Sequence, residues 1–378
     1  MNNVVVAGFA RSPFHLSRKG ALINLRPDDL AAQVVSGLLA RTGIDPTLIE
    51  DLAMGCSYPE AEQGSNIARI VSFRAGIGES VPGVTINRFC GSSMSAIHYA
   101  AGQIALGFGD AFIAGGVESM TRVPQGGFNK TPNPTLLETH AEVYTSMGMT
   151  AENVALRYEV SREAQEALAV ASHAKAAAAR AEGRLADEIV PIQTPDGLVS
   201  EDGCIRPGTS AQGLAGLKPV FKEDGSVTAG TSSPLTDGAS ATLICTEAFA
   251  REHGLVPLAR IKSAAVAPVK PELMGIGPIP ASRKALARAG ISVNELDVVE
   301  INEAFASQAI ACIRELQLDE ARINLDGGGL AIGHPLGATG ARLVGKAAAL
   351  LKRSGGRYAL ATQCIGGGQG IATVLEAI

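Results

Sequence analysis

Val84-Thr-Ile-Asn-Arg-Phe-Cys90-Gly-Ser-Ser-Met-Ser-Ala-Ile97 is the stretch around which we expect the fold to be organised. A β-branched run over 84–86 is followed by Cys90 and then by an Ala-rich segment over 92–106. This pattern predicts a strand, a sharp turn and a buried helix, with the cysteine close to the helix N-terminus. The unpaired N–H groups and the dipole at that end lower the pKa of a thiol, which suits a nucleophile. A buried structural cysteine is the alternative that this stretch alone leaves open.

The composition is that of a globular chain, with 46% hydrophobic residues among 378. A chain of this length can bury a large core and suggests two or three domains. Lys and Arg total 32 against 37 Asp and Glu, giving a net charge of -5, whereas a nucleic-acid-binding protein more usually carries a basic excess. No apolar run approaches the length of a membrane span. We therefore expect neither a nucleic-acid partner nor a membrane span.

The cysteines are spread along the chain, and none forms a Cys-x-x-Cys pair. None lies at zinc-ligand spacing from a histidine, so we expect no metal site. With no secretory signal pattern, free thiols in a reducing compartment are the simplest interpretation, and the expected location is the cytoplasm. The six cysteines are Cys56, Cys90, Cys204, Cys245, Cys312 and Cys364.

Strand and helix patterns alternate along most of the chain, which predicts an α/β fold with a largely parallel central sheet. The order of patterns in residues 251–378 repeats the order in residues 1–120, so we expect two similar halves. Residues 121–250 are rich in loops and contain one long Ala-rich helix. Long loops of this kind often cover a substrate site, and we expect this segment to cover the sheet.

Local patterns place the individual elements as follows. Thr150 is expected to cap one helix of the covering segment, and Ser161 the long one. Helices are predicted over 27–40, 66–73, 92–106, 161–182, 281–289, 305–316 and 341–351. Strands are predicted over 4–7, 48–55, 84–86, 111–117, 259–266, 298–301, 322–325, 358–364 and 371–375, with a loop over 11–14.

Three further reactive side chains lie in the second half, each where a strand is expected to end. His334 lies in the Gly-rich stretch 327–340, the counterpart of the Cys90 turn, so that a pseudo-twofold packing of the halves would bring Cys90 and His334 together. Cys364 leaves a strand into a run of glycines, and Asn302 follows an apolar strand, where open α/β sheets place their sites. A structural histidine and a helix N-cap are the alternatives for His334 and Asn302.

The combination of these motifs resembles the thiolase family across essentially the whole chain. The motifs are Asn87-Arg-Phe-Cys90-Gly-Ser-Ser-Met94, Thr228-Ala-Gly-Thr-Ser-Ser233, Met274-Gly-Ile-Gly-Pro-Ile-Pro280, Asn302-Glu-Ala-Phe305, Gly333-His334-Pro-Leu-Gly337 and Cys364-Ile-Gly-Gly-Gly-Gln-Gly370. The resemblance implies a duplicated αβαβα layered fold of two similar halves with an α-rich loop domain inserted. The expected domains are 1–120 with Cys90, 121–250 as the covering domain, and 251–378 with His334 and Cys364.

The resemblance also implies a ping-pong acyltransferase mechanism. Cys90 would take the acyl group as a thioester, and His334 would be the base that activates it. Cys364 would be the second acid/base, acting on the α-carbon of acetyl-CoA. One oxyanion site would be formed by His334 with a water held by Asn302, and the other by the backbone N–H groups of Cys90 and Gly366.

Coenzyme A would be a substrate of such an enzyme, together with acyl-CoA and acetyl-CoA, and no cofactor is implied. Ser233 would contact the pantetheine arm, and Arg206 would lie near the nucleotide end. The apolar residues Met147, Phe221, Met274 and Phe305 would line the tunnel. An ordinary core position is the alternative for each apolar residue, and a solvated loop charge is the alternative for Arg206.

The sequence departs from the short-chain biosynthetic members at Ser146, where those enzymes commonly have a histidine before Met-Gly. The Ser-Ser-Met that follows the Cys90-Gly pair is more similar to degradative 3-ketoacyl-CoA thiolases. We expect that activity, with a short-chain acetyl-CoA acetyltransferase as the alternative. A homodimer is expected, and because the loop over 121–146 looks short, a dimer of dimers stays open.

Three other classes compete with this interpretation. A β-ketoacyl synthase would carry a histidine or an asparagine in place of Cys364. A cysteine hydrolase would need Cys90 and His334 but not Cys364. A non-catalytic acyl-CoA- or lipid-binding relative would have no reason to retain all four reactive side chains.

Overall fold

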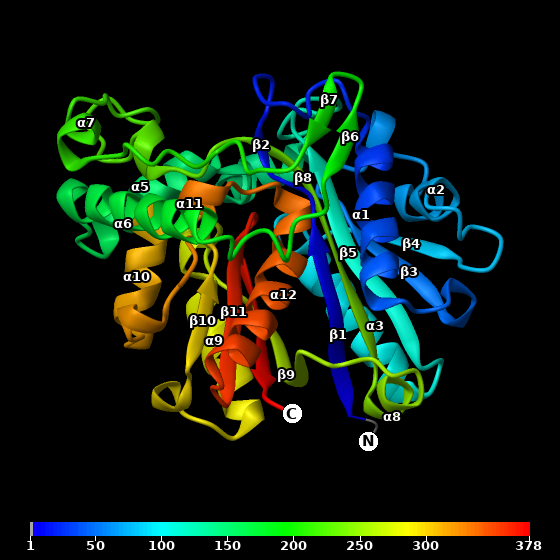
Figure 1. Ribbon diagram of the computed structural model, residues 1–378. Helices are drawn as coiled ribbons and strands as arrows, with labels where there is room; N and C mark the ends of the chain where they lie inside the picture. Colours follow the sequence, from blue (N-terminus) through cyan, green and yellow to red (C-terminus); the bar gives the residue numbers. More distant parts are fainter. Residues whose placement is uncertain (1–2) are drawn as a thin grey trace.

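The computed structural model describes residues 3–378 and contains one large mixed sheet together with a two-stranded hairpin (Figure 1). The strands are β1 (Val4–Arg11), β2 (His15–Leu16), β3 (Asp51–Gly55), β4 (Gly83–Ile86), β5 (Ala111–Ser119), β6 (Ile192–Thr194), β7 (Gly197–Val199), β8 (Thr236–Thr246), β9 (Ala259–Pro268), β10 (Val298–Ile301), β11 (Tyr358–Ile365) and β12 (Gln369–Glu376). The large sheet has the order β10-β11-β12-β9-β1-β8-β5-β3-β4, with β2 paired to β8, and β6 pairs with β7.

The helices lie on both faces of the sheet and across one end of it. They are α1 (Pro27–Thr42), α2 (Ile67–Arg74), α3 (Ser92–Leu106), α4 (Pro134–Thr139), α5 (Met147–Arg157), α6 (Arg162–Ala181), α7 (Ala211–Ala215), α8 (Glu247–Glu252), α9 (Pro278–Ala289), α10 (Ala306–Leu316), α11 (Gly329–Ile332) and α12 (Leu336–Ser354). No helix in residues 3–378 is long and apolar enough to cross a membrane.

The two halves repeat the same strand pairings, which confirms the expected duplicated α/β fold. In the N-terminal half β3 pairs in parallel with β4 and β5, and β8 runs antiparallel to both β5 and β1. In the C-terminal half β10 pairs in parallel with β11, and β12 runs antiparallel to both β11 and β9. The halves meet where β1 and β9 pair antiparallel. A single parallel bridge, Val299 to Ile323, stands where β4 stands in the other half.

The expectation of a largely parallel sheet is wrong, because β8 and β12 return antiparallel beside β5 and β11. The turn between β11 and β12 is too short for the crossover that a parallel neighbour requires. The predicted strand over 322–325 is also wrong, since that segment holds a short 3-10 helix, Glu320–Arg322, and the single bridge at Ile323. Arg11, expected in a loop, is the last residue of β1.

Helices α3 and α12 form the central layer between the halves, and they meet close to their N-termini. Gly340 in α12 has no room for a side chain, because a Cβ there would lie 2.4 Å from the backbone nitrogen of Met94 in α3. The backbone N–H of Ala341 donates to Ser93 Oγ at 2.9 Å. This close packing brings together the turns that precede the two helices, which carry Cys90 and His334.

The covering segment lies across the end of the sheet at which β10 and β11 finish (Figure 1). Its long helix α6 begins as expected, with Ser161 Oγ accepting from the backbone N–H of Ala164. The other expected cap is wrong, because α5 begins one turn earlier, after Ser146, and Thr150 lies inside it. Residues 236–246 form the fully buried strand β8 between β1 and β5, so they belong to the sheet and not to the covering segment.

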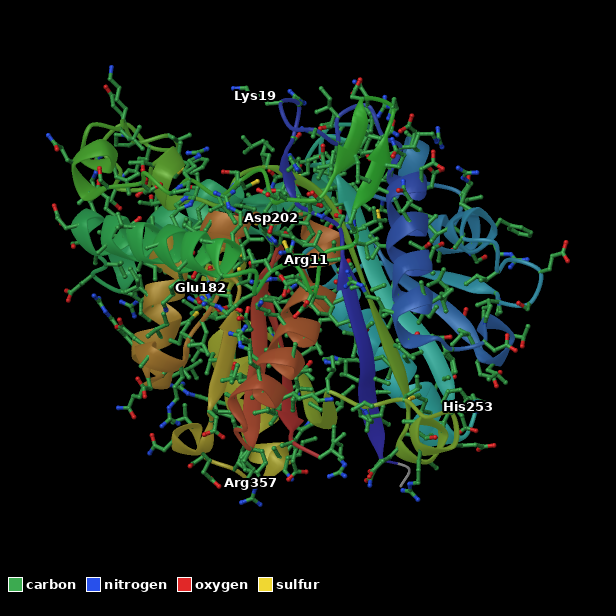
Figure 2. The ribbon with its side chains drawn as sticks, viewed as in Figure 1. Arg11, Lys19, Glu182, Asp202, His253 and Arg357 are labelled. Carbon is green, nitrogen blue, oxygen red and sulfur yellow. The ribbon has the colours of Figure 1, made fainter. Side chains whose placement is uncertain are left out.

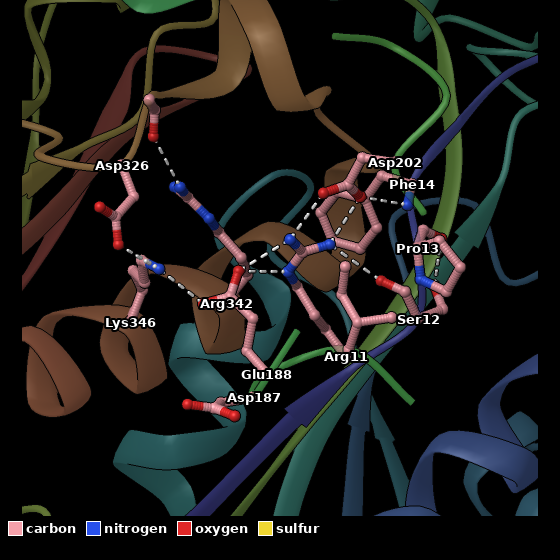
Figure 3. A network of polar contacts seen from close by, with 12 residues as sticks. Arg11, Ser12, Pro13, Phe14, Asp187, Glu188, Asp202, Asp326, Arg342 and Lys346 are labelled. Atoms are coloured by element: carbon pink, nitrogen blue, oxygen red, sulfur yellow. Dashed lines mark hydrogen bonds and ion pairs between the residues drawn. The ribbon is translucent and has the colours of Figure 1, made fainter. Parts of the chain in front are cut away.

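A buried network of charges ties the covering segment to both halves (Figure 3). Arg11 lies 2.7 Å from Glu188 and 2.7 Å from Asp202, both in the covering segment. Lys346 in α12 lies 2.8 Å from Glu188 and 2.8 Å from Asp326. Arg11 and Asp202 are buried and lie near the middle of the molecule in Figure 2, whereas Lys19, His253 and Arg357 lie at its edge. Because Arg11 and Lys346 each share two carboxylates, removing one carboxylate would leave buried positive charge only partly compensated.

The network makes the free energy of unfolding depend on pH in the acidic range. Burial alone would raise the pKa of Glu188, yet the charges of Lys346 and Arg11 hold that pKa at about 2, below its ordinary 4.5. A depressed pKa contributes stability above the unfolded value, and that contribution is lost as the pH falls from about 4.5 to about 2. At about 1.4 kcal/mol per unit, we expect a loss on the order of 3 kcal/mol in the free energy of unfolding.

Urea unfolding of the wild type and of Glu188→Gln at pH 6 and near pH 3 measures this loss. The variant is expected to be less stable than the wild type at pH 6 and to depend less on pH. An equal acid dependence in the two proteins would show that Glu188 is not its source.

Candidate active site

The Cys90 turn is built by hydrogen bonds among the residues around it. Phe89 has a φ of 44°, a left-handed conformation that costs a non-glycine residue roughly 1–2 kcal/mol. Asn87 Oδ1 accepts from the Phe89 N–H at 2.9 Å, and Ser92 Oγ accepts from the Arg88 N–H at 2.9 Å while donating to the Phe89 carbonyl at 2.5 Å. These bonds offset the strain and place Cys90 directly before α3, as the sequence predicted.

Cys90 is 9% exposed, and burial raises its pKa to about 11. The backbone N–H groups of Gly366 and of Cys90 itself stabilise the thiolate and act in the opposite direction, and Glu118 adds to the rise. The expectation of a lowered thiol pKa is therefore wrong, because burial outweighs the helix N-terminus. A thiol with this pKa is protonated near neutral pH and needs a base to become a nucleophile.

His334 lies in the turn before α12 and is almost fully buried. Its Nδ1 lies 2.6 Å from Thr339 Oγ1, and its backbone N–H donates to Thr236 Oγ1 at 3.1 Å. Burial lowers the pKa of the imidazole to about 4, so the ring is neutral near pH 7 and has a free nitrogen to accept a proton. Leu336, two residues further on, packs in one buried cluster with Cys90. The structure therefore brings the Cys90 and His334 turns together.

Asn302 lies directly after β10, and its amide faces the histidine. Asn302 Nδ2 lies 3.3 Å from His334 Nε2 and 3.4 Å from Nδ1. Its Oδ1 is buried and has no hydrogen-bond partner within residues 3–378. The helix that follows, α10, is capped at Phe305, so Asn302 is not its N-cap. The amide is thus positioned beside the imidazole, where it can hold a water or a substrate oxygen.

Cys364 is fully buried near the end of β11, opposite Gly370 of β12. Burial raises its pKa well above the ordinary range, and the nearby thiols of Cys90 and Cys312 add to the rise. Cys90 and Cys364 are therefore within electrostatic reach of one another. Two protonated thiols, a neutral histidine and an amide gather in one buried site, a set that suits acyl transfer through a thioester.

Both parts of the chain match the same protein family. Residues 4–248 match the family described as "Thiolase, N-terminal domain", and residues 255–377 match "Thiolase, C-terminal domain". The chain belongs to the thiolase family. Members of this family are acyltransferases, and the short-chain specialist alternative is not favoured by the relatives described next.

Several relatives of this thiolase are similar over their full length. The 3-ketoacyl-CoA thiolase of Bacillus subtilis (strain 168) is 46% identical over 389 residues, covering 100% of both chains. That of Pseudoalteromonas translucida (strain TAC 125) is 47% identical, again covering 100% of both. That of Saccharophagus degradans is 44% identical, covering 100% of this chain and 98% of the relative.

Four of the expected coenzyme A residues gather beside Cys364. Met147, Met274 and Phe305 pack with it in one buried cluster. The rings of Phe221 and Phe305 meet edge to face at 6.0 Å between centroids, and Phe221 is 37% exposed. A continuous set of apolar contacts thus extends from Cys364 to the partly exposed ring of Phe221, on the side where this thiolase carries its covering segment.

Ser233 and Arg206 are less closely associated with Cys364 than these four residues are. The Ser233 N–H donates to the carbonyl of Ala304, next to Phe305, so Ser233 lies at the edge of the apolar cluster. Arg206 is exposed, and its backbone N–H donates to His173 Nδ1 at 3.1 Å on α6. No contact within the described residues joins the Arg206 side chain to the cysteine site.

Sequence reasoning missed Glu118 and Tyr58, which also border the site of this thiolase. Glu118 is fully buried at the end of β5 and accepts from the N–H groups of Ser57 at 2.8 Å and Gly337 at 2.9 Å. It thereby ties the start of α12 to the first half. Tyr58 packs with Cys90, Met120 and Leu336. Neither residue lies in a motif, although a charged residue at the end of an apolar strand was a usable signal for Glu118.

Proposed function

We propose that this thiolase is a degradative 3-ketoacyl-CoA thiolase, which cleaves a 3-ketoacyl-CoA with coenzyme A to acetyl-CoA and a shortened acyl-CoA. The observation that carries the proposal is the meeting of Cys90, His334, Asn302 and Cys364 in one buried site. The full-length relatives named 3-ketoacyl-CoA thiolase support the choice of substrate class. The equilibrium of this chemistry favours cleavage, and metabolite supply sets the direction.

In the first half-reaction the Cys90 sulfur attacks the 3-oxo carbonyl while its proton passes to His334. The C2–C3 bond then breaks, and its electron pair leaves as the enolate of acetyl-CoA. The Cys364 thiol protonates that enolate at carbon, which releases acetyl-CoA and leaves an acyl thioester on Cys90. The proton held by His334 then returns to the Cys364 thiolate. In the second half-reaction His334 accepts the proton of the coenzyme A thiol while its sulfur attacks the thioester, and passes that proton to Cys90, which departs as the thiol.

Two groups of hydrogen-bond donors support the charges that develop. We assign the thioester oxygen of the acetyl unit to His334 and a water held by Asn302, whose Nδ2 already lies beside the ring. We assign the oxygen of the tetrahedral intermediate on Cys90 to the N–H groups of Cys90 and Gly366, which would donate hydrogen bonds to it. The same groups stabilise the Cys90 thiolate. Donors fixed in a dry site are commonly the largest single contribution to catalysis.

The role of His334 predicts a loss of thiol reactivity in His334→Ala. The Cys90 pKa of about 11 leaves little thiolate near neutral pH without a base. We expect alkylation of Cys90 by iodoacetamide between pH 6 and 9 to slow on the order of 10²-fold. His173→Ala, which removes a histidine outside the site, is the control. An unchanged alkylation rate in His334→Ala would show that His334 is not the base.

The proposed substrate class is tested by thiolysis of acetoacetyl-CoA and of a medium-chain 3-ketoacyl-CoA, followed by loss of the magnesium-enolate absorbance. We expect both substrates to be cleaved, with the higher kcat/KM for the longer chain. Cleavage of acetoacetyl-CoA alone would leave the mechanism in place and contradict the degradative role. No cleavage of either would contradict the proposal as a whole.

We further propose that the enzyme is a homodimer and works in the cytoplasm. Strand β4 is an open edge of the sheet, and unpaired edges are usually covered. Phe89, beside Cys90, is 40% exposed and packs against Tyr58, so a partner at this edge would also shield the site. All six cysteines are free, which fits a reducing compartment. Light scattering after size exclusion separates a dimer, a dimer of dimers and a monomer, and a monomer would contradict the proposal.

A further inference from the structure

Gln363 links the two cysteine-bearing segments directly. It precedes Cys364 in β11, is fully buried, and its side-chain NH₂ donates to the backbone carbonyl of Cys90. A carbonyl oxygen only accepts, so the amide must present its nitrogen to Cys90. In residues 3–378 this is the only side-chain hydrogen bond that reaches the Cys90 peptide.

Two further contacts hold the same turn against the β11–β12 hairpin. Arg88 Nη1 donates to Gln369 Oε1 at 3.2 Å. Gly91 packs on the hairpin so closely that a Cβ there would lie 2.5 Å from Ile365 Cδ1. The turn and the hairpin therefore pack closely together, and Gln363 is the residue that both precedes Cys364 in sequence and bonds the Cys90 carbonyl.

The amide of Gln363 is not explained by stability. Its Oε1 is buried and has no hydrogen-bond partner among the described residues. A buried unpaired oxygen is unfavourable. An apolar side chain of similar shape would remove it but would also leave the Cys90 carbonyl without its side-chain donor, so the two effects on folding stability oppose each other. The hydrogen bond to Cys90 is the feature that such a replacement would lose.

We propose that Gln363 is a positioning residue that sets the separation of the Cys90 and Cys364 thiols, an inference that rests on the proposed function. Acyl exchange between coenzyme A molecules uses only Cys90 and His334. Carbon–carbon cleavage also requires Cys364 to deliver its proton to the α-carbon of a substrate bound at Cys90. An error in the distance between the thiols therefore slows cleavage and leaves exchange nearly unchanged.

The test compares two rates in Gln363→Met, with Gln363→Leu as a second variant. Exchange is measured with acetyl-CoA and isotopically labelled coenzyme A, and cleavage by thiolysis of a 3-ketoacyl-CoA. Since small misplacements of reacting groups cost up to about 10²-fold, we expect thiolysis to fall roughly 10- to 100-fold and exchange to change by less than about 3-fold. The thermal midpoint is expected to change little, because removing the unpaired Oε1 opposes the loss of the hydrogen bond to the Cys90 carbonyl.

Gln165→Met is the matched control, because Gln165 is another fully buried glutamine with an unpaired Oε1 and donates to the Val160 carbonyl at 3.3 Å, away from the cysteines. Both of its rates are expected to equal those of the wild type. Equal losses of the two rates in the Gln363 variants, or no loss of either, would overturn the inference. The wild-type enzyme is assayed first. If it showed no thiolysis, the proposed function itself would be overturned before any Gln363 variant is compared.

Discussion

Replacing Cys90 with alanine is expected to abolish both acyl exchange and thiolysis, by on the order of 10⁴-fold or more. Every step of the proposed reaction passes through a thioester on this sulfur, and the site offers no equivalent nucleophile at the same turn. Cys364 lies close by, but burial raises its pKa well above the ordinary range, and it lies outside the Cys90 turn. Both rates are measured with acetyl-CoA and a 3-ketoacyl-CoA at saturating concentrations.

Cys245→Ala is the control for this variant, since Cys245 is a fully buried free thiol in β8 that faces no part of the reaction. It is expected to keep wild-type rates. Near-normal thiolysis in Cys90→Ala would contradict the covalent mechanism. Loss of activity together with loss of the cooperative unfolding transition would be assigned to misfolding, and Cys90→Ser then serves as the second variant.

Cys364→Ala is expected to separate the two kinds of chemistry. Cys90 and His334 remain, so acyl exchange should continue within about 10-fold of the wild type. Thiolysis should fall on the order of 10²- to 10⁴-fold, because a positioned acid contributes about that much to proton transfer. Exchange of the α-protons of acetyl-CoA with deuterated water should be lost to the same extent.

Cys312→Ala provides the matched control, because Cys312 is a buried neighbour that contributes to the raised pKa of Cys364. Its thiol donates to the Gly275 carbonyl at 3.4 Å and is not assigned to the reaction. If Cys364→Ala lost acyl exchange between coenzyme A molecules but kept normal exchange of the α-protons of acetyl-CoA, the roles of the two cysteines would have to be reversed. Full thiolysis in that variant would show that Cys364 is not the acid that protonates the enolate.

The parts of the fold that could be predicted are those whose pattern is local. Helix α3 begins and ends where the sequence places it, because a strand, a turn and an Ala-rich run succeed one another there. Helix α1 ends at Gly43 with a φ of 66°, as a glycine after an amphipathic run indicates. The duplication was visible as a repeated order of elements, and it correctly predicted the meeting of the Cys90 and His334 turns.

The sequence-based predictions are wrong where tertiary packing, and not the local sequence, determines the structure. Strand β8 is rich in threonine, serine, alanine and glycine, a composition that predicts a loop. All of it is nevertheless buried, because β1 and β5 pair with it on either side. The pKa of Cys90 was expected to fall because its place at a helix N-terminus is local, whereas the burial that raises it depends on the whole fold. Gln363 and Glu118 have partners that lie more than 200 residues away in sequence, at Cys90 and Gly337, so local spacing does not indicate what these two side chains contact.

The most direct test of the central claim is the mass of the enzyme after incubation with a medium-chain 3-ketoacyl-CoA in the absence of free coenzyme A. Cleavage without the second half-reaction should leave on Cys90 an acyl group two carbons shorter than the substrate chain, with acetyl-CoA released in equal amount. Peptide mapping places the adduct. The intact 3-ketoacyl group on Cys90 would contradict carbon–carbon cleavage and indicate a hydrolase, and an enzyme without any adduct would contradict covalent catalysis altogether.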